Sequence, residues 1–381
     1  MSKYTEKDIT IVVPSYNNLD YLKLLYQSVR DVSTDVELII YSDGSTDGTK
    51  EWLVTINDSN ATMIHYDIRA GHTLLYDWGF QKSKRAIIGI LHADMVVHKN
   101  FFSNILKHIN EGVVVCGTCV EPPLHPPGGE KHIFDAGMYP KDFNMDRFNG
   151  FCDGLDIDRV KHGIFAPWFL LRDEYMERIG KHDDMFAPYG YEDADLFTRM
   201  ALKQFTFIQS RDALVYHFTQ RGHKWTKGVG IENDGYKEQM NHTRREYVRK
   251  FGTDPLFDAD HAPTPAPKYD IGFIVSNGNK VIMQYLEPHC STLYIDYKKG
   301  ELEAYAAEQH SAYNMTDRIK PFGVDKVNDI LVSFDANKLT QQSVNVLMQL
   351  PLIIQDTNDT GTFEYDIFTI QINKLNEVIV C

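Results

Sequence analysis

A histidine and an aspartate, His92 and Asp94, follow the apolar run 87–91 with one residue between them. The run has the composition of a buried strand. In an open α/β sheet, ligands bind at the carboxyl ends of the strands. An imidazole nitrogen and a carboxylate oxygen at such an end suit a divalent cation such as Mn²⁺. The alternative interpretation is an ordinary turn aspartate, since aspartate is common where strands end.

Three acids, Glu192, Asp193 and Asp195, stand together at the start of a predicted helix over 192–202. Acids in a first turn stabilise a helix through its dipole. Acids that crowd together also raise one another's pKa, which suits a general base that removes a proton. The residues alone leave both interpretations open.

His217 and the basic segment after it complete the set of candidate residues. His217 lies in the strand-like run 215–218, where a histidine is more often a core residue than a metal ligand. Residues 220–230 are polar and basic and contain glycine, His223 and Trp225, so we expect a loop over a site.

The first half of the chain alternates between short apolar runs and helical stretches. Strands are predicted over 9–13, 36–41, 63–68 and 87–91, with helices between them. This alternation indicates an α/β domain with a mostly parallel, twisted sheet and flanking helices. The first strand is not followed by a G-x-G-x-x-G turn, and the sequence contains no P-loop motif. The usual dinucleotide and P-loop fingerprints are therefore excluded.

Three prolines among small and polar residues mark a linker. We place it at 256–268, between a first domain over 1–255 and a second over 269–381. The second domain is expected to be smaller and β-rich, of the α+β class. Its predicted elements are one helix over 340–350 and short strands over 271–275, 281–285, 292–297, 330–334 and 367–372.

The bulk composition is that of a soluble globular protein. The 381 residues carry a formal net charge of −14, which disfavours nucleic acid and anionic membranes as partners. The sequence contains no run of about 18 apolar residues, so no transmembrane segment is expected. The first residues lack the apolar core of a signal peptide, and the cytoplasm is the expected compartment. The five cysteines are scattered, and buried reduced thiols are expected.

Six pieces of the sequence, taken in their order, point to a known family. They are 11–17 (IVVPSYN), 42–49 (SDGSTDGT), 91–94 (LHAD), 189–196 (YGYEDADL), the strand with His217, and 247–252 (YVRKFG). Each piece is weak alone, but together they give a strong joint signal. Over residues 9–252 the chain resembles the family-2 inverting glycosyltransferases, which have the GT-A fold.

The resemblance implies roles at the matching positions. Asp193 would be the base that activates the acceptor, with Glu192 beside it, and Asp94 and His217 would bind Mn²⁺ or Mg²⁺. His92 replaces the first acid of the family's D-x-D element, which leaves open whether it ligates the metal. The residues implied in nucleotide-sugar binding are Pro14, Tyr16, Asp43, Arg69, Gly71, His92 and Ala93. The candidates for the acceptor or a closing loop are His223, Trp225 and Trp168, the last of which is open to a core role.

The expected activity is therefore metal-dependent, inverting transfer of a sugar from a nucleotide diphosphate sugar. A UDP-sugar is the expected donor, and a hydroxyl on a glycan or a related molecule is the expected acceptor. One alternative is an inactive GT-A-like protein kept for binding or assembly. Another is a sugar-nucleotide pyrophosphorylase, although the glycine-rich basic signature of that class is missing after the first strand. The second domain would bind acceptor, form a homo-oligomer or support the first domain.

Overall fold

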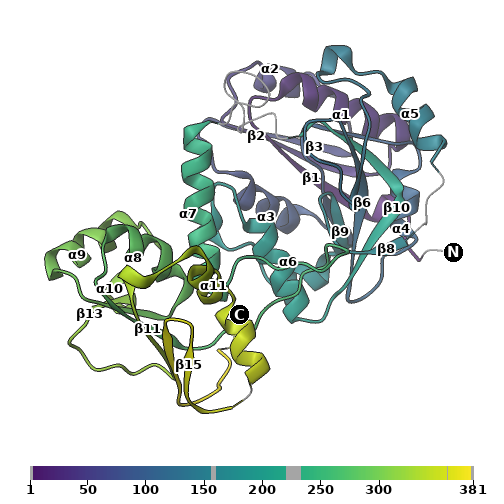
Figure 1. Ribbon diagram of the computed structural model, residues 1–381. Coiled ribbons are helices and arrows are strands. Elements are labelled where there is room, and N and C mark those ends of the chain that lie inside the picture. The colour runs from purple at the N-terminus through teal and green to yellow at the C-terminus, as the bar shows by residue number, and fades with distance from the viewer. Residues whose placement is uncertain (1–2, 156–159, 220–232, 358, 379–381) are drawn as a thin grey trace. The chain divides into compact units, whose positions relative to one another are not determined.

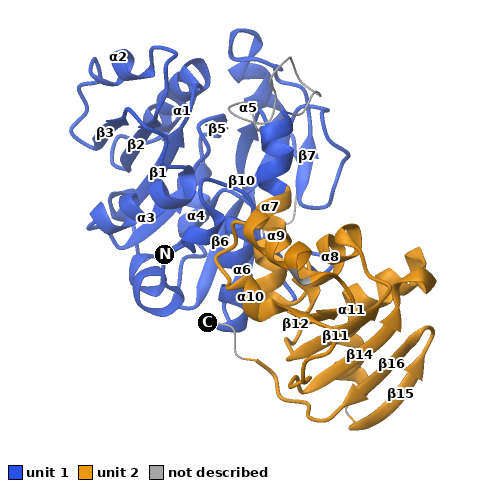
Figure 2. Ribbon diagram, turned by 90° about the vertical axis from the view of Figure 1, so that its left-hand side faces the viewer, with its two compact units in different colours: residues 1–240, 257–264 blue, residues 241–256, 265–381 orange. Residues whose placement is uncertain are grey.

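The computed structural model describes residues 3–155, 160–219, 233–357 and 359–378. It divides into two compact units, coloured separately in Figure 2. Unit 1 comprises residues 1–240 and 257–264, and unit 2 comprises residues 241–256 and 265–381. Among the helices of the described residues, none has the length and apolar character needed to cross a membrane.

Unit 1 alternates between strands and helices, as Figure 1 shows. Its strands are β1 Ile9–Ser15, β2 Glu37–Asp43, β3 Ala61–Tyr66, β4 Ile87–Ile90, β5 Met95–Val97, β6 Val113–Glu121, β7 Lys131–Ile133, β8 Val160–His162, β9 Trp168–Leu171 and β10 Thr206–His217. Its α-helices are α1 Leu19–Val32, α2 Thr49–Leu53, α3 His72–Lys82, α4 Phe101–Leu106, α5 Met145–Asp153, α6 Glu192–Leu202 and the first part of α7 Asp234–Phe251. The short helices η3 Glu174–Ile179 and η4 Asp184–Phe186 precede α6.

The described strands of unit 1 form one ten-stranded sheet in the order β3-β2-β1-β4-β9-β6-β10-β5, with β7 beside β6 and β8 beside β10. The strands β1 to β4 are parallel neighbours. Strand β9 is antiparallel to β4 and β6, whereas β6 and β10 run parallel. Strand β5 is antiparallel to β10 at the end of the row. The predicted α/β class with a mostly parallel sheet is confirmed.

Helices cover both faces of this sheet. In β1, Ile9, Ile11 and Val13 pack with α1, α2 and α4, whereas Val12 packs on the other face with α3 and α6. Because side chains alternate between the two faces of a strand, a strand that is covered on both faces is apolar throughout. This explains the continuous apolar runs of the sequence.

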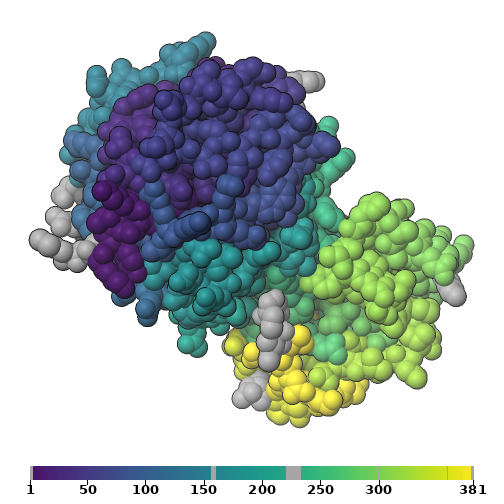
Figure 3. Space-filling view, turned by 180° about the vertical axis from the view of Figure 1, so that it is seen from behind, coloured from purple at the N-terminus to yellow at the C-terminus, as the bar shows by residue number. Residues whose placement is uncertain are grey.

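In Figure 3 the N-terminal part of unit 1, in purple and blue, forms a continuous surface.

The row of strands changes direction at β1. Strands β2 and β3 extend to one side of β1, and β4 lies on the other side. The loops that follow β1 and β4 therefore diverge and open a crevice at the carboxyl ends of the strands. Tyr16 follows β1, Asp43 ends β2, and His92 and Asp94 follow β4, so the sheet order brings these residues to one edge.

Unit 2 has its own six-stranded sheet, in the order β13-β12-β11-β14-β16-β15. Strands β11 to β14 are parallel neighbours, and β15 and β16 are antiparallel. Its strands are β11 Ile271–Ser276, β12 Thr292–Ile295, β13 Ile319–Pro321, β14 Ile330–Asp335, β15 Gly361–Tyr365 and β16 Phe368–Ile372. Its helices are α8 Lys280–Leu286, α9 Lys299–Glu308, α10 Met315–Arg318, α11 Gln341–Thr357 and the second part of α7.

The second sheet is confirmed, but the strand predicted over 281–285 is wrong, because these residues lie in α8. The side chain of Asn279 caps α8 by accepting the backbone N–H of Ile282 at 3.0 Å. Met283 and Leu286, three residues apart, are buried on one helix face. The β-branched pair at 281–282 had favoured a strand. Since helices connect the parallel strands, unit 2 contains more helix than the prediction of a β-rich domain implied.

The division into units differs in position from the linker placed at 256–268. Residues 257–264 cluster with unit 1, whereas residues from 265 onward cluster with unit 2. Residues 241–256, which we assigned to the first domain, also cluster with unit 2. The second part of α7 is therefore part of the unit 2 core rather than a closing helix of unit 1.

A buried carboxylate, Glu287, ties α7 to the rest of unit 2. It is fully buried and accepts hydrogen bonds from Arg249 at 2.6 Å and from Arg318 at 2.6 Å. Arg249 also donates to the buried Glu246, whose other oxygen accepts from Ser311. Burial raises the pKa of Glu287, but the hydrogen bonds and charges of Arg249 and Arg318 outweigh burial and lower this pKa to about 2. The group is therefore ionised and paired in the folded state.

We predict that Glu287→Gln destabilises unit 2 by about 3–5 kcal/mol, because it leaves buried guanidinium groups without their counter-charge. Since the folded-state pKa is lowered, the contribution of Glu287 is present above pH 4–5 and is lost as the pH falls toward 2. Urea unfolding at pH 7 and pH 3 measures both effects. Glu301→Gln, on the exposed start of α9, is the control. Equal stability of the two variants at pH 7 would contradict the prediction.

Candidate active site

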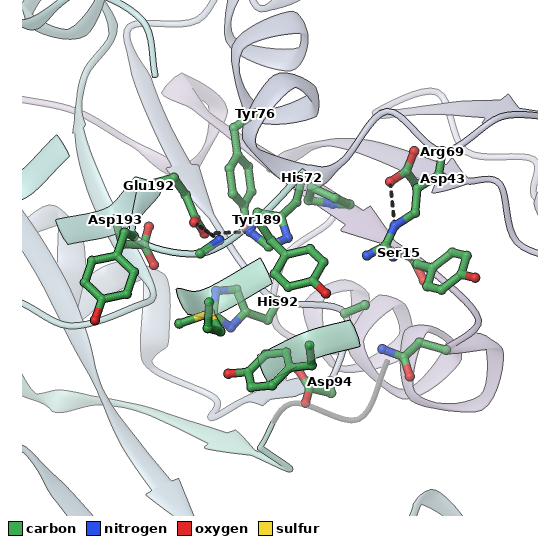
Figure 4. Close-up of a pocket in the computed structure, with 18 of the residues that line it drawn as sticks. Ser15, Asp43, Arg69, His72, Tyr76, His92, Asp94, Tyr189, Glu192 and Asp193 are labelled. Atoms are coloured by element: carbon green, nitrogen blue, oxygen red, sulfur yellow. Dashed lines mark hydrogen bonds and ion pairs between the residues drawn. The ribbon is translucent and has the colours of Figure 1, made fainter. Parts of the chain in front are cut away.

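A cavity of about 380 Å³ lies in unit 1 at the carboxyl edge of the sheet (Figure 4). Its size is within the range of small-molecule sites. Figure 4 shows Asp43 and Arg69 at one side, Glu192 and Asp193 at the other, and His92 and Asp94 between them. The predicted residues that line the cavity are Pro14, Tyr16, Asp43, Arg69, His92, Ala93, Asp94, Glu192, Asp193 and His217.

Asp43 holds the backbone at the Arg69 side of the cavity. Its two carboxylate oxygens accept the backbone N–H groups of Ala70 and Gly71, at 2.6 and 2.9 Å. Gly71 is the residue before α3 and has a φ of +91°, which glycine adopts readily. A Cβ on Gly71 would meet the backbone of Pro188 at 2.4 Å. Gly71 therefore acts through backbone geometry and does not itself line the cavity.

Arg69 lies between two tyrosine rings. Its guanidinium carbon is 4.1 Å from the ring centre of Tyr16 and 5.3 Å from that of Tyr189, which are cation–π distances. Its Nε is 3.7 Å from Asp43 and has no hydrogen-bond partner within the described part of the chain. Since Arg69 also lines the cavity, its positive charge is placed where it could attract an anionic ligand.

Strand pairing brings three potential metal ligands together. His92 and Asp94 follow β4, and His217 ends β10, whose antiparallel pairing with β5 places it opposite Met95. The backbone N–H of Phe218 donates to the carbonyl of Asp94 at 3.0 Å, which fixes this register. His92, Asp94 and His217 each offer a ligand atom, and these three atoms lie within 4.8 Å of one another.

Glu121 determines which ring nitrogen of His217 carries a proton. The Nδ1 of His217 lies 3.1 Å from Glu121, which also accepts from Lys131 at 2.8 Å. Because a carboxylate can only accept, Nδ1 carries the proton. Nε2 then faces Asp94 at 3.6 Å and is buried without a hydrogen-bond partner among the described residues. This orphaned nitrogen beside a carboxylate fits a bound divalent cation.

The pKa directions agree with a place for a cation. Burial lowers the pKa of His217, but Asp94, Cys119 and Glu121 outweigh it and raise this pKa well above its ordinary value. A proton therefore occupies the ring when no cation is bound, and a cation would displace it. Burial and the charge of His217 lower the pKa of His92 to about 4, so His92 is a neutral ligand at pH 7.

A second group, formed by Cys119, Glu121 and His217, also lies within 4.8 Å. Burial raises the pKa of the Cys119 thiol, which keeps it protonated. Lys131 already pairs with Glu121. Hydrogen bonding to His217 accounts for this group without a second cation.

Glu192 and Asp193, adjacent at the start of α6, have pKa values that are shifted in opposite directions. Glu192 pairs with Nε2 of His72 at 2.6 Å. Burial raises the pKa of Glu192, but the charge and hydrogen bond of His72 outweigh burial, so the net shift is downward. Burial and the negative charge of Glu192 raise the pKa of Asp193 above its ordinary range. Glu192 is thus a fixed ion, and Asp193 is a carboxyl with a raised affinity for a proton.

Among the predicted residues that the structure describes, Trp168 joins Gly71 outside the cavity wall. Trp168 is fully buried in the core between the sheet and α6, and it does not line the cavity, so an acceptor cannot stack on it there. His223 and Trp225 lie outside the described residues.

Several residues that line the cavity or hold a lining residue escaped the sequence-based reasoning. His72 follows Gly71 in a stretch that was assigned only as a helix, and Glu121 ends β6 without a recognisable motif. One sequence feature could have identified Glu121 as a site residue. It stands at the carboxyl end of an apolar strand, as Asp94 does. The other lining residues that were not predicted include Tyr76, Tyr189, Tyr191, Tyr236 and Met240.

Comparison with known proteins assigns the first part of the chain. Residues 10–179 match the model of the family named Glycosyl transferase family 2. This part of the chain belongs to glycosyltransferase family 2. The predicted family is confirmed, although the match ends before α6, which carries Glu192 and Asp193.

Relatives and solved structures are similar to this chain at low identity. The uncharacterized glycosyltransferase YfnE of Bacillus subtilis (strain 168) is 23% identical over an alignment of 252 residues, and the match covers 55% of this chain and 64% of the relative. The chain thus spans slightly less than two thirds of that relative. A mannosyltransferase from Pyrobaculum calidifontis, solved with GDP-Man and Mn²⁺, is 16% identical with a TM-score of 0.43, over 64% of this chain and 63% of that one. TarS residues 1–349 from S. aureus are 12% identical with a TM-score of 0.42, over 74% and 71%.

We predict that Glu121→Gln weakens Mn²⁺ binding by about 10-fold, because His217 loses the charged partner that orients its ring. Calorimetric titration of the unliganded protein with MnCl₂ at pH 7 measures the affinity directly. Glu111→Gln, with its exposed carboxylate, is the matched control. Unchanged Mn²⁺ affinity in Glu121→Gln would remove Glu121 from the site.

Proposed function

We propose that this chain is an inverting glycosyltransferase that moves a sugar from a nucleotide diphosphate sugar to an acceptor hydroxyl. One observation carries the proposal above the others. A three-residue candidate metal-ligand set and a partly buried aspartate with a raised pKa face the same cavity. Family membership of residues 10–179 supports the same reaction class.

The Arg69 side of the cavity would bind the nucleotide. Tyr16 offers an aromatic face on which a base can stack. Arg69 brings its positive charge to the cavity wall and would contact the diphosphate. We propose a UDP-sugar as the donor to test first.

His92, Asp94 and His217 would hold Mn²⁺ or Mg²⁺. Two imidazole nitrogens and one carboxylate oxygen suit Mn²⁺ better than Mg²⁺, which prefers oxygen alone. When bound, the metal would neutralise charge on the diphosphate as a Lewis acid. Glu121 keeps Nε2 of His217 directed to that position.

Asp193 would remove the proton from the acceptor hydroxyl. The acceptor oxygen then forms a bond to the anomeric carbon as the bond from that carbon to the diphosphate oxygen breaks. Attack from the side opposite the diphosphate inverts the anomeric configuration. Glu192 is the weaker base of the two, because its pairing with His72 lowers its pKa.

The acceptor would enter beside Asp193. Tyr191, Tyr236 and Met240 line the cavity together with Asp193. Flat aromatic faces next to a base suit a sugar ring that presents one hydroxyl. We propose a hydroxyl on a glycan as the acceptor class.

The first experiment titrates a panel of UDP-, GDP- and dTDP-sugars into the protein, with and without MnCl₂, by calorimetry. The same panel is assayed for release of the nucleoside diphosphate with oligosaccharide acceptors. Metal-dependent binding of one donor class, followed by release and an inverted product by NMR, would support the proposal. Absence of binding by every donor at millimolar concentration would overturn it.

We predict that Asp193→Asn lowers transfer by about 10²–10⁴-fold, which is the usual contribution of a positioned base, and leaves donor affinity unchanged. Asp94→Asn should weaken donor binding only when Mn²⁺ is present. Calorimetry and initial rates on the same preparations separate the two effects. Loss of donor binding in Asp193→Asn would contradict its assignment as the base.

The pH profile provides an independent prediction. Transfer should fall as the pH drops through the raised pKa of Asp193, because the protonated carboxyl cannot accept a proton. The midpoint of this fall in rate, the acid limb of the pH profile, should lie above the ordinary aspartate pKa of about 4. Glu192→Gln removes the charge that raises this pKa, so its acid limb should move to lower pH. A limb that moves upward or not at all in Glu192→Gln would contradict the role of Asp193.

A further inference from the structure

A buried polar cluster lies beside the candidate base but outside the cavity wall. It consists of Asp77 on α3, Tyr175 on η3 and His182 in the loop between η3 and η4. All three side chains are nearly or fully buried. None of them lines the cavity, so they would not contact substrate.

The hydrogen bonds of this cluster place a proton on Nδ1 of His182. Tyr175 donates its hydroxyl proton to Asp77. The Nδ1 of His182 lies 2.7 Å from the Tyr175 oxygen and 3.0 Å from Asp77. Since the Tyr175 proton is committed and Asp77 only accepts, Nδ1 must carry a proton. The backbone N–H of His182 also donates to Asp77 at 3.2 Å, which fixes the ring from two points.

This arrangement leaves the other ring nitrogen of His182 unused. Its Nε2 is buried and has no hydrogen-bond partner among the residues that the structure describes. Among the described residues, Trp168 Nε1 and Asp193 Oδ1 are also buried without a hydrogen-bond partner of good geometry. The ring of His182 lies 6.5 Å from that of Trp168 and 5.7 Å from that of Tyr76, and Tyr76 lines the cavity with Asp193. Three unsatisfied polar atoms in one region are unusual for a core, and such groups often mark a functional site.

The helix that carries Asp193 also holds the loop that carries His182. Nε of Arg199 on α6 donates to the fully buried Asp195 at 2.8 Å. Its remaining nitrogens donate to the carbonyls of Ile179 at 2.9 Å and Lys181 at 3.0 Å. The His182 loop is therefore fixed to α6 on both sides of Gly180.

The charges around Asp193 are consistent with a direct electrostatic link. Burial and Glu192 raise the pKa of Asp193, whereas His182, His72 and a hydrogen-bonding contribution from Trp168 lower it. The pKa of Glu192 is likewise lowered by His72 and, to a smaller extent, by His182. His182 and Trp168 thus favour the ionised form of a base that burial would otherwise protonate. The titratable and charged groups that face this region are Tyr76, Asp77, His72, Tyr175, Glu192 and Arg199.

We propose that His182, held by Asp77 and Tyr175, is a positioning residue whose imidazolium form, with Nε2 also protonated, supports the carboxylate of Asp193 from the protein interior together with the Trp168 indole. This rests on the proposed function, in which Asp193 is the base. A base that must be ionised in a buried site needs a donor or positive charge on its inner side, because its outer side faces the acceptor. The proposal gives Trp168 a functional contact without placing it in the cavity.

The test measures the carboxyl of Asp193 directly and does not require a known donor. The full chain is labelled at the aspartate side-chain carboxyl carbons, and its NMR spectra are recorded across pH 3–9. The signal that disappears in Asp193→Asn identifies the carboxyl. In His182→Asn, which keeps a donor near Asp77 but removes the position of Nε2, the titration midpoint should move up by about one unit. In His182→Gln, which keeps an N–H near that position, the shift should be smaller.

The exposed neighbour Lys181 provides a matched control, and Lys181→Ala should leave the midpoint unchanged. Thermal unfolding of each variant checks the fold. If His182→Asn does not fold, the ring nitrogens of ¹⁵N-histidine are compared in wild type and Asp193→Asn. The His182 ring is recognised by its proton on Nδ1. The ¹⁵N chemical shift of its Nε2 should then differ between wild type and Asp193→Asn.

An unmoved midpoint in a folded His182→Asn, or an unmoved Nε2 shift in Asp193→Asn, would overturn the proposal and leave His182 a structural residue. A transfer assay on wild type, run in parallel, tests the proposed function separately. Absence of transfer with a shifted midpoint would reject the enzyme assignment while keeping the electrostatic link.

Discussion

The antiparallel pairing of β5 with β10 is the constraint on which the site depends most. Asp94 and His217 are far apart in the chain, and the ladder that sets His217 opposite Met95 brings them within reach of one cation. A shift of this register by one residue would turn His217 to the other face of the sheet. The bond from Phe218 to the carbonyl of Asp94 holds the end of the ladder where a slip would begin. The arrangement of these candidate ligands is therefore specified by backbone hydrogen bonds rather than by the ligands themselves.

The sequence predicts the first sheet well because its strands are covered on both faces. Such strands appear as continuous apolar runs, and residues 87–91 and 9–13 correspond closely to β4 and β1. Unit 2 was harder, since a short amphipathic helix such as α8 and a strand can share β-branched residues. The residues 281–282 misled the prediction, and only the cap at Asn279 distinguishes the two outcomes.

The site was predictable where a motif marks it and unpredictable where the fold alone brings residues together. Glu192 and Asp193 stand in a recognisable run, but nothing in the sequence connects them with His72, 120 positions away, which determines how they divide the charge. Glu121 and His182 are similarly remote from the groups they support. Supporting residues of this kind have no fixed spacing from their partners, because the connection is made by strand order and helix packing.

The close approach of Gly71 to Pro188 links two parts of the cavity that lie far apart in sequence. The backbone amide of Gly71 fixes Asp43 near Arg69, while Pro188 directly precedes the segment that leads into Glu192 and Asp193. With 2.4 Å available, no side chain fits at position 71 unless the 187–189 backbone retreats. The two halves of the site therefore cannot diversify independently. In a selection that randomises both segments, surviving chains with a residue other than glycine at position 71 would carry compensating changes around position 188, so their evolution would be coupled.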